Sequence, residues 1–150
     1  TRLTHPVKKA FYVREIAERV ISLTKDRVAD SGAVCTYVEK SDDILLYADE
    51  GQITQILINL IKNATEADAG RIEITAEINL SEHVIINVFN DGRAISKESR
   101  EEIFVPFFTT KQEGTGIGLS LSRQIMRLHN GTLTLTQSDE NGTIFTLIFR

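Results

Sequence analysis

Apolar residues recur at helical spacing in three stretches of the chain. Residues 13–31 place an apolar side chain at about every third or fourth position, which predicts an amphipathic helix ended by Gly32. The same spacing predicts a second helix over residues 50–69, which Gly70 would end. A third helix is predicted over residues 118–131, because its last two residues, Asn and Gly, favour a left-handed helix end.

Alternation of apolar and polar residues predicts strands in most of the remaining chain. We expect strands at residues 33–39, 44–49, 71–80, 83–90, 132–138 and 142–149. The last four form two hairpins, the second of which turns at the sequence DENG. Residues 96–104 predict a short helix with a serine cap, and residues 1–12 look irregular. Hairpins among helices indicate an α/β (α+β) two-layer sandwich, with one mixed, mostly antiparallel sheet and helices on one face.

The composition indicates one domain and narrows its partners. The chain has 150 residues, 41% of them hydrophobic, which is enough for one core. Its net charge is −4 without a basic stripe, so nucleic acid and anionic membrane are not expected partners. Cys35 is the single cysteine, which rules out an internal disulfide and fits a reducing, cytoplasmic compartment. Because no apolar run spans a membrane and the chain begins without Met, we expect a cytoplasmic domain of a longer protein, which can itself be membrane-attached.

The predicted helix over residues 50–69 has an unusual polar side. At about 100° per residue, its apolar side is formed by Ile53, Ile56, Leu57, Leu60, Ile61 and Ala64. Nearly opposite lie Gln55, Asn59, Asn63 and Glu66. A solvated side would more naturally carry Lys, Glu or Gln, which form helices better than Asn. Two Asn oxygens on one ridge can instead hold a hydrated Mg²⁺ ion and its phosphates, with a solvated surface as the alternative.

A glycine-rich segment, EGTGIGLSLSRQ, leads into the third predicted helix. Gly114, Gly116 and Gly118 would let backbone N–H groups approach a phosphate, whose charge the helix N-terminus favours. The segment lacks the Gly-Lys-Ser of a Walker A loop, and no strand leads directly into it as in a dinucleotide fingerprint. A flexible loop with an ordinary helix cap is the alternative.

The sequence VFNDGRAIS ends a predicted strand with Asn90, Asp91 and Gly92. This composition is typical of a turn, which is one interpretation. The other interpretation is adenine recognition, because the adenine 6-amino group is a donor and needs a fixed acceptor. An Asn or Asp side chain at a strand end offers such an acceptor.

Taken in order, these stretches resemble the ATP-binding domain of sensor histidine kinases. The N box resembles NLIKNATEA, the first glycine box NDGRAI, the phenylalanine box IFVPFFTTK and the second glycine box GTGIGLSLS. This domain belongs to the ATPase superfamily shared with gyrase, the ninety-kilodalton chaperone and mismatch-repair proteins. The resemblance implies a Bergerat-type ATP-binding fold and a catalytic domain over residues 13–150, with residues 1–12 as a linker remnant. Only Gln112 and Glu113 separate Lys111 from the glycines, which resembles kinases with a very short lid.

The resemblance implies a role for each residue that matches a motif. Asn63 would be the Mg²⁺ ligand, and Asn59 and Lys111 would be the catalytic residues at the phosphates. The nucleotide would contact Asn59, Lys62, Asn63, Asn90, Asp91, Gly92, Thr109, Thr110, Lys111, Gly114, Thr115, Gly116, Ile117, Gly118, Leu119 and Thr143. Among these, Thr143 would support the adenine contact through water.

One position departs from the resembled family. The family pattern is Asp-x-Gly-x-Gly, whereas here Asn90 stands at the Asp position and Ala94 at the second Gly. The Asn oxygen still accepts a hydrogen bond but carries no charge, so either nucleotide binds more weakly or Asp91 takes over part of the role. We rank Asn90 first and Asp91 second as the adenine acceptor. A degenerate nucleotide-binding regulatory module therefore stays open as an alternative.

The reaction that the resemblance implies is phosphoryl transfer rather than hydrolysis. Gyrase-like members place a glutamate at the position of Asn59 to activate water, and an amide cannot act as a general base. The γ-phosphoryl group of ATP would pass to a histidine on a separate dimerisation domain of the same parent protein, and then to a response regulator receiver domain. His5, His83 and His129 do not match an acceptor pattern. A serine kinase of the anti-sigma-factor type is a further alternative, and the fragment itself is expected to be monomeric.

Overall fold

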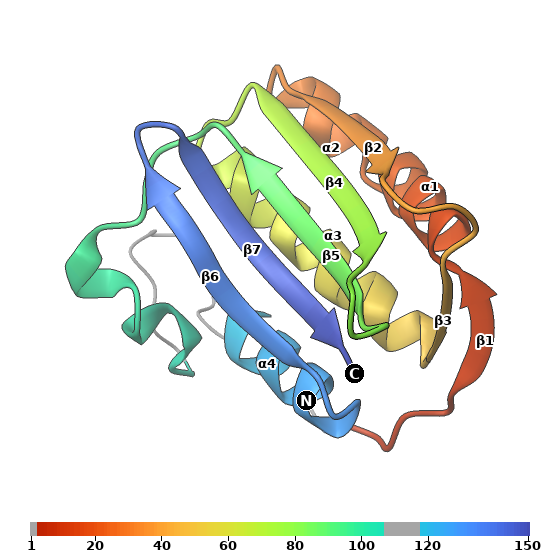
Figure 1. The fold of residues 1–150 in the computed structure, drawn as a ribbon. Helices are drawn as coiled ribbons and strands as arrows, with labels where there is room; N and C mark the ends of the chain where they lie inside the picture. The colour runs from red at the N-terminus through yellow and green to blue at the C-terminus, as the bar shows by residue number, and fades with distance from the viewer. Residues whose placement is uncertain (1–2, 107–117) are drawn as a thin grey trace.

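The molecule consists of a central sheet with helices packed on one of its faces (Figure 1). The computed structural model describes residues 3–106 and 118–150. Its helices are α1 (Val13–Leu23), α2 (Lys25–Asp30), α3 (Glu50–Glu66) and α4 (Gly118–Leu128), with the 3-10 turns η1 (Lys97–Ser99) and η2 (Glu102–Phe104). Its strands are β1 (Lys9–Tyr12), β2 (Val34–Glu39), β3 (Leu45–Ala48), β4 (Arg71–Ile78), β5 (Val84–Asn90), β6 (Thr132–Asp139) and β7 (Gly142–Phe149). The predicted two-layer α/β sandwich is confirmed.

The main sheet is mixed and mostly antiparallel, as predicted. Its strand order is β2-β4-β5-β7-β6, and among the described strands β2 and β4 are the one parallel pair. The two predicted hairpins are β4–β5 and β6–β7. Their register aligns inward-facing residues in rows across the sheet, one of which is Ile74, Val88, Phe145 and Leu135. The helices cover this face, so the rows form the floor of the hydrophobic core.

Helix α3 contributes a continuous block of the core. Its predicted apolar side is confirmed, because Ile53, Ile56, Leu57, Leu60, Ile61 and Ala64 are each at most 1% exposed. Burying one Ile or Leu side chain contributes about 1.5–3 kcal/mol, whereas an Asn in a helix costs less than about 1 kcal/mol. Packing therefore decides that this segment is helical and which side of it faces the sheet. No helix among the described residues is long and apolar enough to cross a membrane.

The first predicted helix is interrupted at Thr24, so residues 13–31 form α1 and α2 rather than one helix. The Thr24 hydroxyl donates to the backbone oxygen of Val20 at 2.8 Å, and the side chain is buried. β-branched Thr is a poor helix former, and this local bond competes with the backbone ladder. Apolar spacing does not reveal such a break, because it continues as far as Val28.

The end of α3 also differs from the prediction. The helix ends at Glu66 rather than at residue 69. The left-handed residue that follows is Asp68, with a φ of 60°, and not Gly70. The Ala69 N–H donates to the Ala64 oxygen at 3.1 Å, and the Ala69 side chain is buried. Burial of Ala69 therefore turns the chain before the glycine is reached.

Three further local predictions were wrong. Residues 96–104 form η1 and η2 instead of an α-helix, and the Ser96 hydroxyl bonds to Ser99 Oγ rather than capping a helix. Strand β3 leaves the main sheet and pairs antiparallel with β1, so the expected single sheet is two sheets. Residues 9–12, predicted to be irregular, form β1 because Phe11 is buried in the core.

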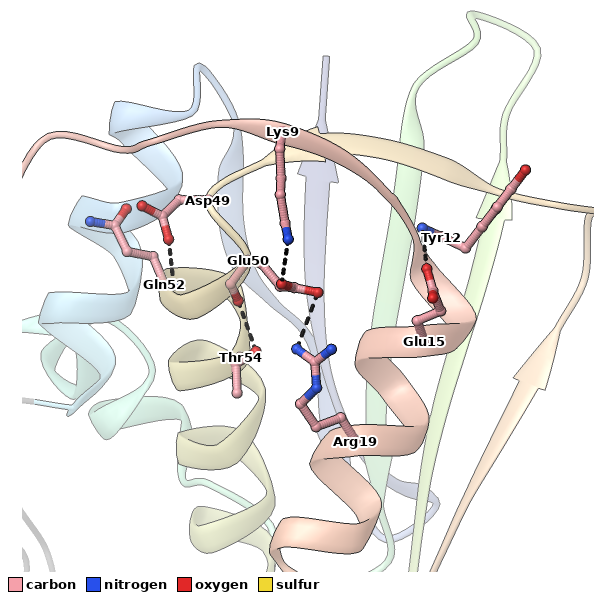
Figure 2. A network of polar contacts seen from close by, with 8 residues as sticks. All are labelled: Lys9, Tyr12, Glu15, Arg19, Asp49, Glu50, Gln52 and Thr54. Carbon is pink, nitrogen blue, oxygen red and sulfur yellow. Dashed lines mark hydrogen bonds and ion pairs between the residues drawn. The ribbon is translucent and has the colours of Figure 1, made fainter.

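A carboxylate joins β1 and α1 to the start of α3 (Figure 2). Glu50 lies 3.2 Å from Lys9 Nζ through Oε1 and 3.1 Å from Arg19 Nη1 through Oε2. The hydrogen bond from Lys9, followed by that from Arg19, outweighs burial and holds the pKa of Glu50 below its ordinary value. The strand that precedes α1 is thereby attached to α3.

Asp49 caps α3 and connects it to two other parts of the chain. Its Oδ1 accepts the Gln52 N–H at 3.0 Å, and its Oδ2 accepts the Val7 N–H at 2.8 Å. The Asp49 N–H donates to Nε2 of His129, just after α4, at 3.0 Å. Burial raises the pKa of Asp49, but the hydrogen bonds from Val7 and Gln52 outweigh it, so the pKa is lowered overall. The ionised carboxylate therefore stabilises the fold.

Asp49→Ala should remove both the helix cap and the contact to Val7. We expect the free energy of unfolding, measured with urea at neutral pH, to fall by about 1–2 kcal/mol. Because the folded pKa of Asp49 lies below 3.8, its stabilisation is present above that pH and is lost as the pH falls through the folded pKa. The stabilities of the two proteins should therefore converge in acid. Asp42→Ala, at an exposed position between β2 and β3, is the control, and equal losses in both variants would contradict the cap.

Candidate functional site

The polar side of α3, formed by Gln55, Asn59, Asn63 and Glu66, is called here the polar ridge, and it contains one buried atom without a hydrogen-bond partner in the described residues. Asn59 and Asn63 are half-buried, whereas Gln55 at the start of the ridge is exposed. Asn59 Nδ2 is fully buried and has no hydrogen-bond partner in the described part of the chain. A buried amide group without a partner costs about 1–3 kcal/mol. Such an atom is a candidate for completion by a ligand or a water molecule.

The ridge lies against the first residue of α4. A Cβ atom built on Gly118 would lie 2.3 Å from Asn59 Oδ1 and 2.7 Å from its Nδ2, far closer than real Cβ contacts. Only glycine fits at this position without movement of the amide. The structure therefore brings together two segments that the sequence separates, the asparagine ridge and the helix start that follows the glycine-rich segment.

One end of the sheet's inner face is polar. Asn90 on β5 is aligned with Thr143 on β7, which is aligned with Ser138 on β6. All three side chains are buried. Thr143 Oγ1 lies 2.7 Å from Ser138 Oγ, which accepts the Ile95 N–H at 2.7 Å. We call Asn90, Thr143 and Ser138 the polar row, and it faces the same layer as the apolar rows of the core.

The turn after β5 lies against the end of α3. Asn90 Oδ1 accepts the Gly92 N–H at 2.9 Å. A Cβ atom on Gly92 would lie 2.5 Å from the Ala67 oxygen, and the Arg93 N–H donates to that same oxygen at 2.8 Å. The Arg93 guanidinium also donates to the backbone oxygen of Glu66 at 2.8 Å. The polar row and the last turn of α3 are therefore held together by backbone contacts.

Asp91, the second-ranked adenine acceptor, has backbone partners of its own. Its Oδ1 accepts the N–H groups of Gly70 and Arg71, both at 2.8 Å. The hydrogen bond from Arg71 outweighs burial and, with that from Gly70, holds the pKa of Asp91 below its ordinary value. Its carboxylate therefore closes the turn between α3 and β4.

Some of the other predicted site residues lie in the described part of the chain and others do not. Lys62 is half-buried on α3, and Leu119 is half-buried and packs against the core. Outside the described residues lie Thr109, Thr110, Lys111, Gly114, Thr115, Gly116 and Ile117, together with the two phenylalanines that precede them.

Sequence reasoning missed Ser138. Alternation along β6 places Leu133 and Leu135 on the inner face, so it predicts that Ser138 points outward. A β-bulge between Leu135 and Gln137 shifts the register and turns Ser138 inward, opposite Thr143. The backbone oxygen of Ser138 also accepts a hydrogen bond from Arg100. The hairpin sequence carries no signal for this bulge.

Helix α3 and the turn that follows it contact both parts of the candidate site. Asn59 meets Gly118 at one point of the helix, and Ala67 meets Gly92 at another. These points are separated by about 12 Å along the helix axis, at 1.5 Å per residue. Asn63 lies midway between them. The arrangement offers a helix N-terminus at one end, a polar row at the other and an amide between.

Sequences of curated relatives align with most of this chain. Sporulation kinase A from Bacillus subtilis (strain 168) is 32% identical over 146 residues, which cover 95% of this chain and 24% of that protein. Sensor histidine kinase ZraS from Escherichia coli (strain K12) is 38% identical over 104 residues, which cover 68% of this chain and 22% of that protein. The chain spans a third or less of the length of the curated relatives it matches.

Solved structures and a family comparison agree with these relatives. The catalytic domain of histidine kinase ThkA matches with a TM-score of 0.84 at 33% identity, covering 95% of this chain and 94% of that chain. Histidine kinase ThkA in complex with response regulator protein TrrA matches with a TM-score of 0.79 at 32% identity, covering 95% of this chain and 41% of that chain. The family described as histidine kinase-, DNA gyrase B-, and HSP90-like ATPase matches residues 48–150. Because this match covers more than half of the chain and all of the candidate site, the chain belongs to the histidine kinase-, DNA gyrase B-, and HSP90-like ATPase family.

Proposed function

We propose that this chain binds ATP with Mg²⁺ and is the catalytic domain of a two-component sensor histidine kinase. It would transfer the γ-phosphoryl group to a histidine on a separate dimerisation domain of the same parent protein. The observation that carries this proposal is the contact between Asn59 of α3 and Gly118 of α4. This contact puts the amide ridge beside a helix N-terminus, where backbone N–H groups favour phosphate.

The described residues fit a nucleotide that lies along α3. Asn90 and Thr143 would hold the base at the polar row, beside the turn at Gly92. Asn59 and Gly118 would lie at the phosphates, at the start of α4. The proposal also assigns nucleotide contacts to Lys62, Asp91, Leu119, Thr109, Thr110, Lys111, Gly114, Thr115, Gly116 and Ile117, the last seven outside the described residues.

Asn63 is the proposed Mg²⁺ ligand. Its half-buried side chain makes no hydrogen bond within the described residues, so its oxygen is available. No group of three His, Cys, Asp or Glu side chains that could hold a metal occurs in that part of the chain. A single protein oxygen suits Mg²⁺, which keeps several waters and takes the rest of its ligands from phosphates. When bound, the ion would neutralise phosphate charge.

The identity of Asn59 favours transfer over hydrolysis. Its amide occupies the position beside Gly118 and cannot act as a general base toward water. Phosphoryl transfer depends mainly on positioning and charge stabilisation, which suffice when another domain delivers the nucleophile. Relatives named as sensor histidine kinases, and one solved with a response regulator, support a receiver domain as the second partner.

Asn63→Ala tests the metal-dependent part of binding. We expect the wild-type chain to bind a fluorescent ATP analogue with Mg²⁺ and to bind it much more weakly after EDTA is added. Asn63→Ala should lose about tenfold or more in affinity, equivalent to about 1.4 kcal/mol, because the metal loses its protein oxygen. Gln55→Ala, two turns earlier on the same ridge and exposed, is the matched control. Equal binding by all three proteins, with or without Mg²⁺, would remove the proposed metal role.

Gly118→Ala tests the contact that carries the proposal. The added Cβ overlaps the Asn59 amide, so we expect the dissociation constant for Mg²⁺-ATP to rise by about tenfold while thermal unfolding stays cooperative. Gly51→Ala is the control, because a Cβ there lies 3.5 Å from its nearest neighbour, Asp49 Oδ1, which is ordinary contact. The two variants are compared by the same ATP titration. Unchanged affinity in Gly118→Ala would place the phosphates elsewhere.

Phosphotransfer is tested by adding the purified dimerisation domain of the parent protein to the chain with labelled ATP. We expect the label to appear on that domain as phosphohistidine, which is labile in acid and stable in base. The reason is that Asn59 cannot take a proton from water as a general base, which favours transfer to a nucleophile from another domain. Acid-stable label would indicate serine transfer, and release of free phosphate without label would indicate hydrolysis.

A further inference from the structure

Arg123 on α4 contacts two other elements at once. Its guanidinium carbon lies 3.6 Å from the centroid of the Phe104 ring on η2. Its Nε and Nη2 both donate to the backbone oxygen of Leu133 on β6, at 3.2 and 3.0 Å. A cation within about 6 Å of a ring centroid is attracted to the face of that ring. One half-buried side chain therefore joins α4 to η2 and to an edge strand of the main sheet.

The core holds both groups that Arg123 contacts. Phe104 is buried and packs edge-to-face on Phe145 of β7, with ring centroids 6.4 Å apart and an interplanar angle of 81°. Leu133 belongs to the same hydrophobic core. Burial lowers the pKa of the Arg123 guanidinium, and repulsion from Arg127 lowers it further, so this cation has lost part of its water shell. The ring and the carbonyl take the place of that water.

Apolar packing alone does not determine the position of α4 along its own axis. Ile125 and Met126 are fully buried and decide which side of the helix faces the core, but the hydrophobic effect is not directional. Hydrogen bonds are directional and restrain sliding. His129, just after α4, is bonded to the first turn of α3, and Arg123 is bonded to β6. Because Arg123 lies about 7.5 Å along the axis from Gly118, its bonds act close to the start of the helix.

We propose that Arg123 is a positioning residue for the phosphates of the nucleotide, because it holds the start of α4 beside Asn59. This inference rests on the proposed nucleotide site and adds a residue to it. A Cβ atom built on Gly118 would lie 2.3 Å from Asn59 Oδ1, so the α4 backbone is in close contact with that amide. Misplacement of a phosphate-binding group by about 1 Å is enough to weaken its action. Arg123 acts through the backbone of α4 and not by touching the nucleotide.

The arrangement requires a guanidinium group. A planar guanidinium can lie on the Phe104 ring while two of its N–H bonds converge on one carbonyl. A lysine ammonium is a compact and strongly hydrated charge, so it cannot replace both contacts. Asn90 and Thr143 lie on β5 and β7 and are aligned by strand pairing. The base end of the proposed site therefore does not depend on Arg123.

Arg123→Lys and Arg123→Met test the inference, because the first keeps the charge and the second keeps only an apolar stem. The 150-residue chain and each variant are titrated with ATP in saturating Mg²⁺. We expect the dissociation constant to rise by about tenfold in both variants, since neither restores the stacked fork. Arg127→Lys and Arg127→Met are the matched controls at an exposed position one turn later on α4, and they should bind ATP as the wild-type chain does.

Nuclear magnetic resonance of the nucleotide-free proteins shows whether Arg123 acts through position. Arg123→Lys should shift the side-chain amide signals of Asn59 and the backbone amide signal of Gly118, because the start of α4 moves relative to α3. The signals of Asn90 should stay at their wild-type positions. An arginine that only stabilised the fold would lower the temperature of unfolding without producing this pattern.

The outcomes separate this inference from the proposed function. Wild-type affinity in Arg123→Lys, or an equal loss in the Arg127 controls, would overturn the inference and leave ATP binding standing. Weaker binding with the Asn59 and Gly118 signals unmoved would also overturn it, because Arg123 would then act without moving α4. Failure of the wild-type chain to bind ATP would overturn both. Should Arg123→Met not fold, Arg123→Lys decides alone by the two measurements.

Discussion

Burial of one side of α3 is the constraint on which the rest of the structure depends. The apolar side chains from Ile53 to Ala64 are withdrawn from water, and no other rotation of the helix about its axis would keep them buried. That rotation turns Asn59 and Asn63 away from the sheet, and it brings Asn59 to the first residue of α4. Hydrophobic packing therefore places the polar groups of the site, and the unpartnered amide of Asn59 is a local cost that the large apolar burial offsets.

The sheet places the other half of the site by register. The antiparallel pairing of β5 with β7 aligns Asn90 with Thr143, and the bulge in β6 brings Ser138 into the same row. Polar groups on a core-facing surface are tolerated because they bond to one another and to backbone N–H groups. The row lies at the end of the sheet where the turn after β5 meets α3, so both layers contribute to the candidate site.

Much of this arrangement could be predicted because it depends on periodicity. The apolar spacing from Ile53 to Ala64 predicted the buried side of α3. The Asn-Gly pair predicted a left-handed residue after the last helix, and Asn130 has a φ of 58°, although α4 itself ends at Leu128 rather than at residue 131. The features that were not predicted depend on contacts distant in sequence or on single local bonds. The hydroxyl of Thr24 breaks a helix that its apolar spacing continues, and the bulge before Ser138 reverses which residues face inward. A pattern along one segment holds no information about either.

The two ends of α3 are held by different interactions. At the first turn, Asp49 and Glu50 use ionised carboxylates, and the Asp49 N–H lies 3.0 Å from Nε2 of His129. At the last turn, Ala67 contacts the Gly92 turn through backbone groups that do not titrate. Asn63 lies about 20 Å along the helix from Asp49. Protonation of Asp49 and Glu50 therefore weakens the fold at the end remote from the candidate site, whereas protonation of Asp91 weakens the turn between α3 and β4, beside the polar row.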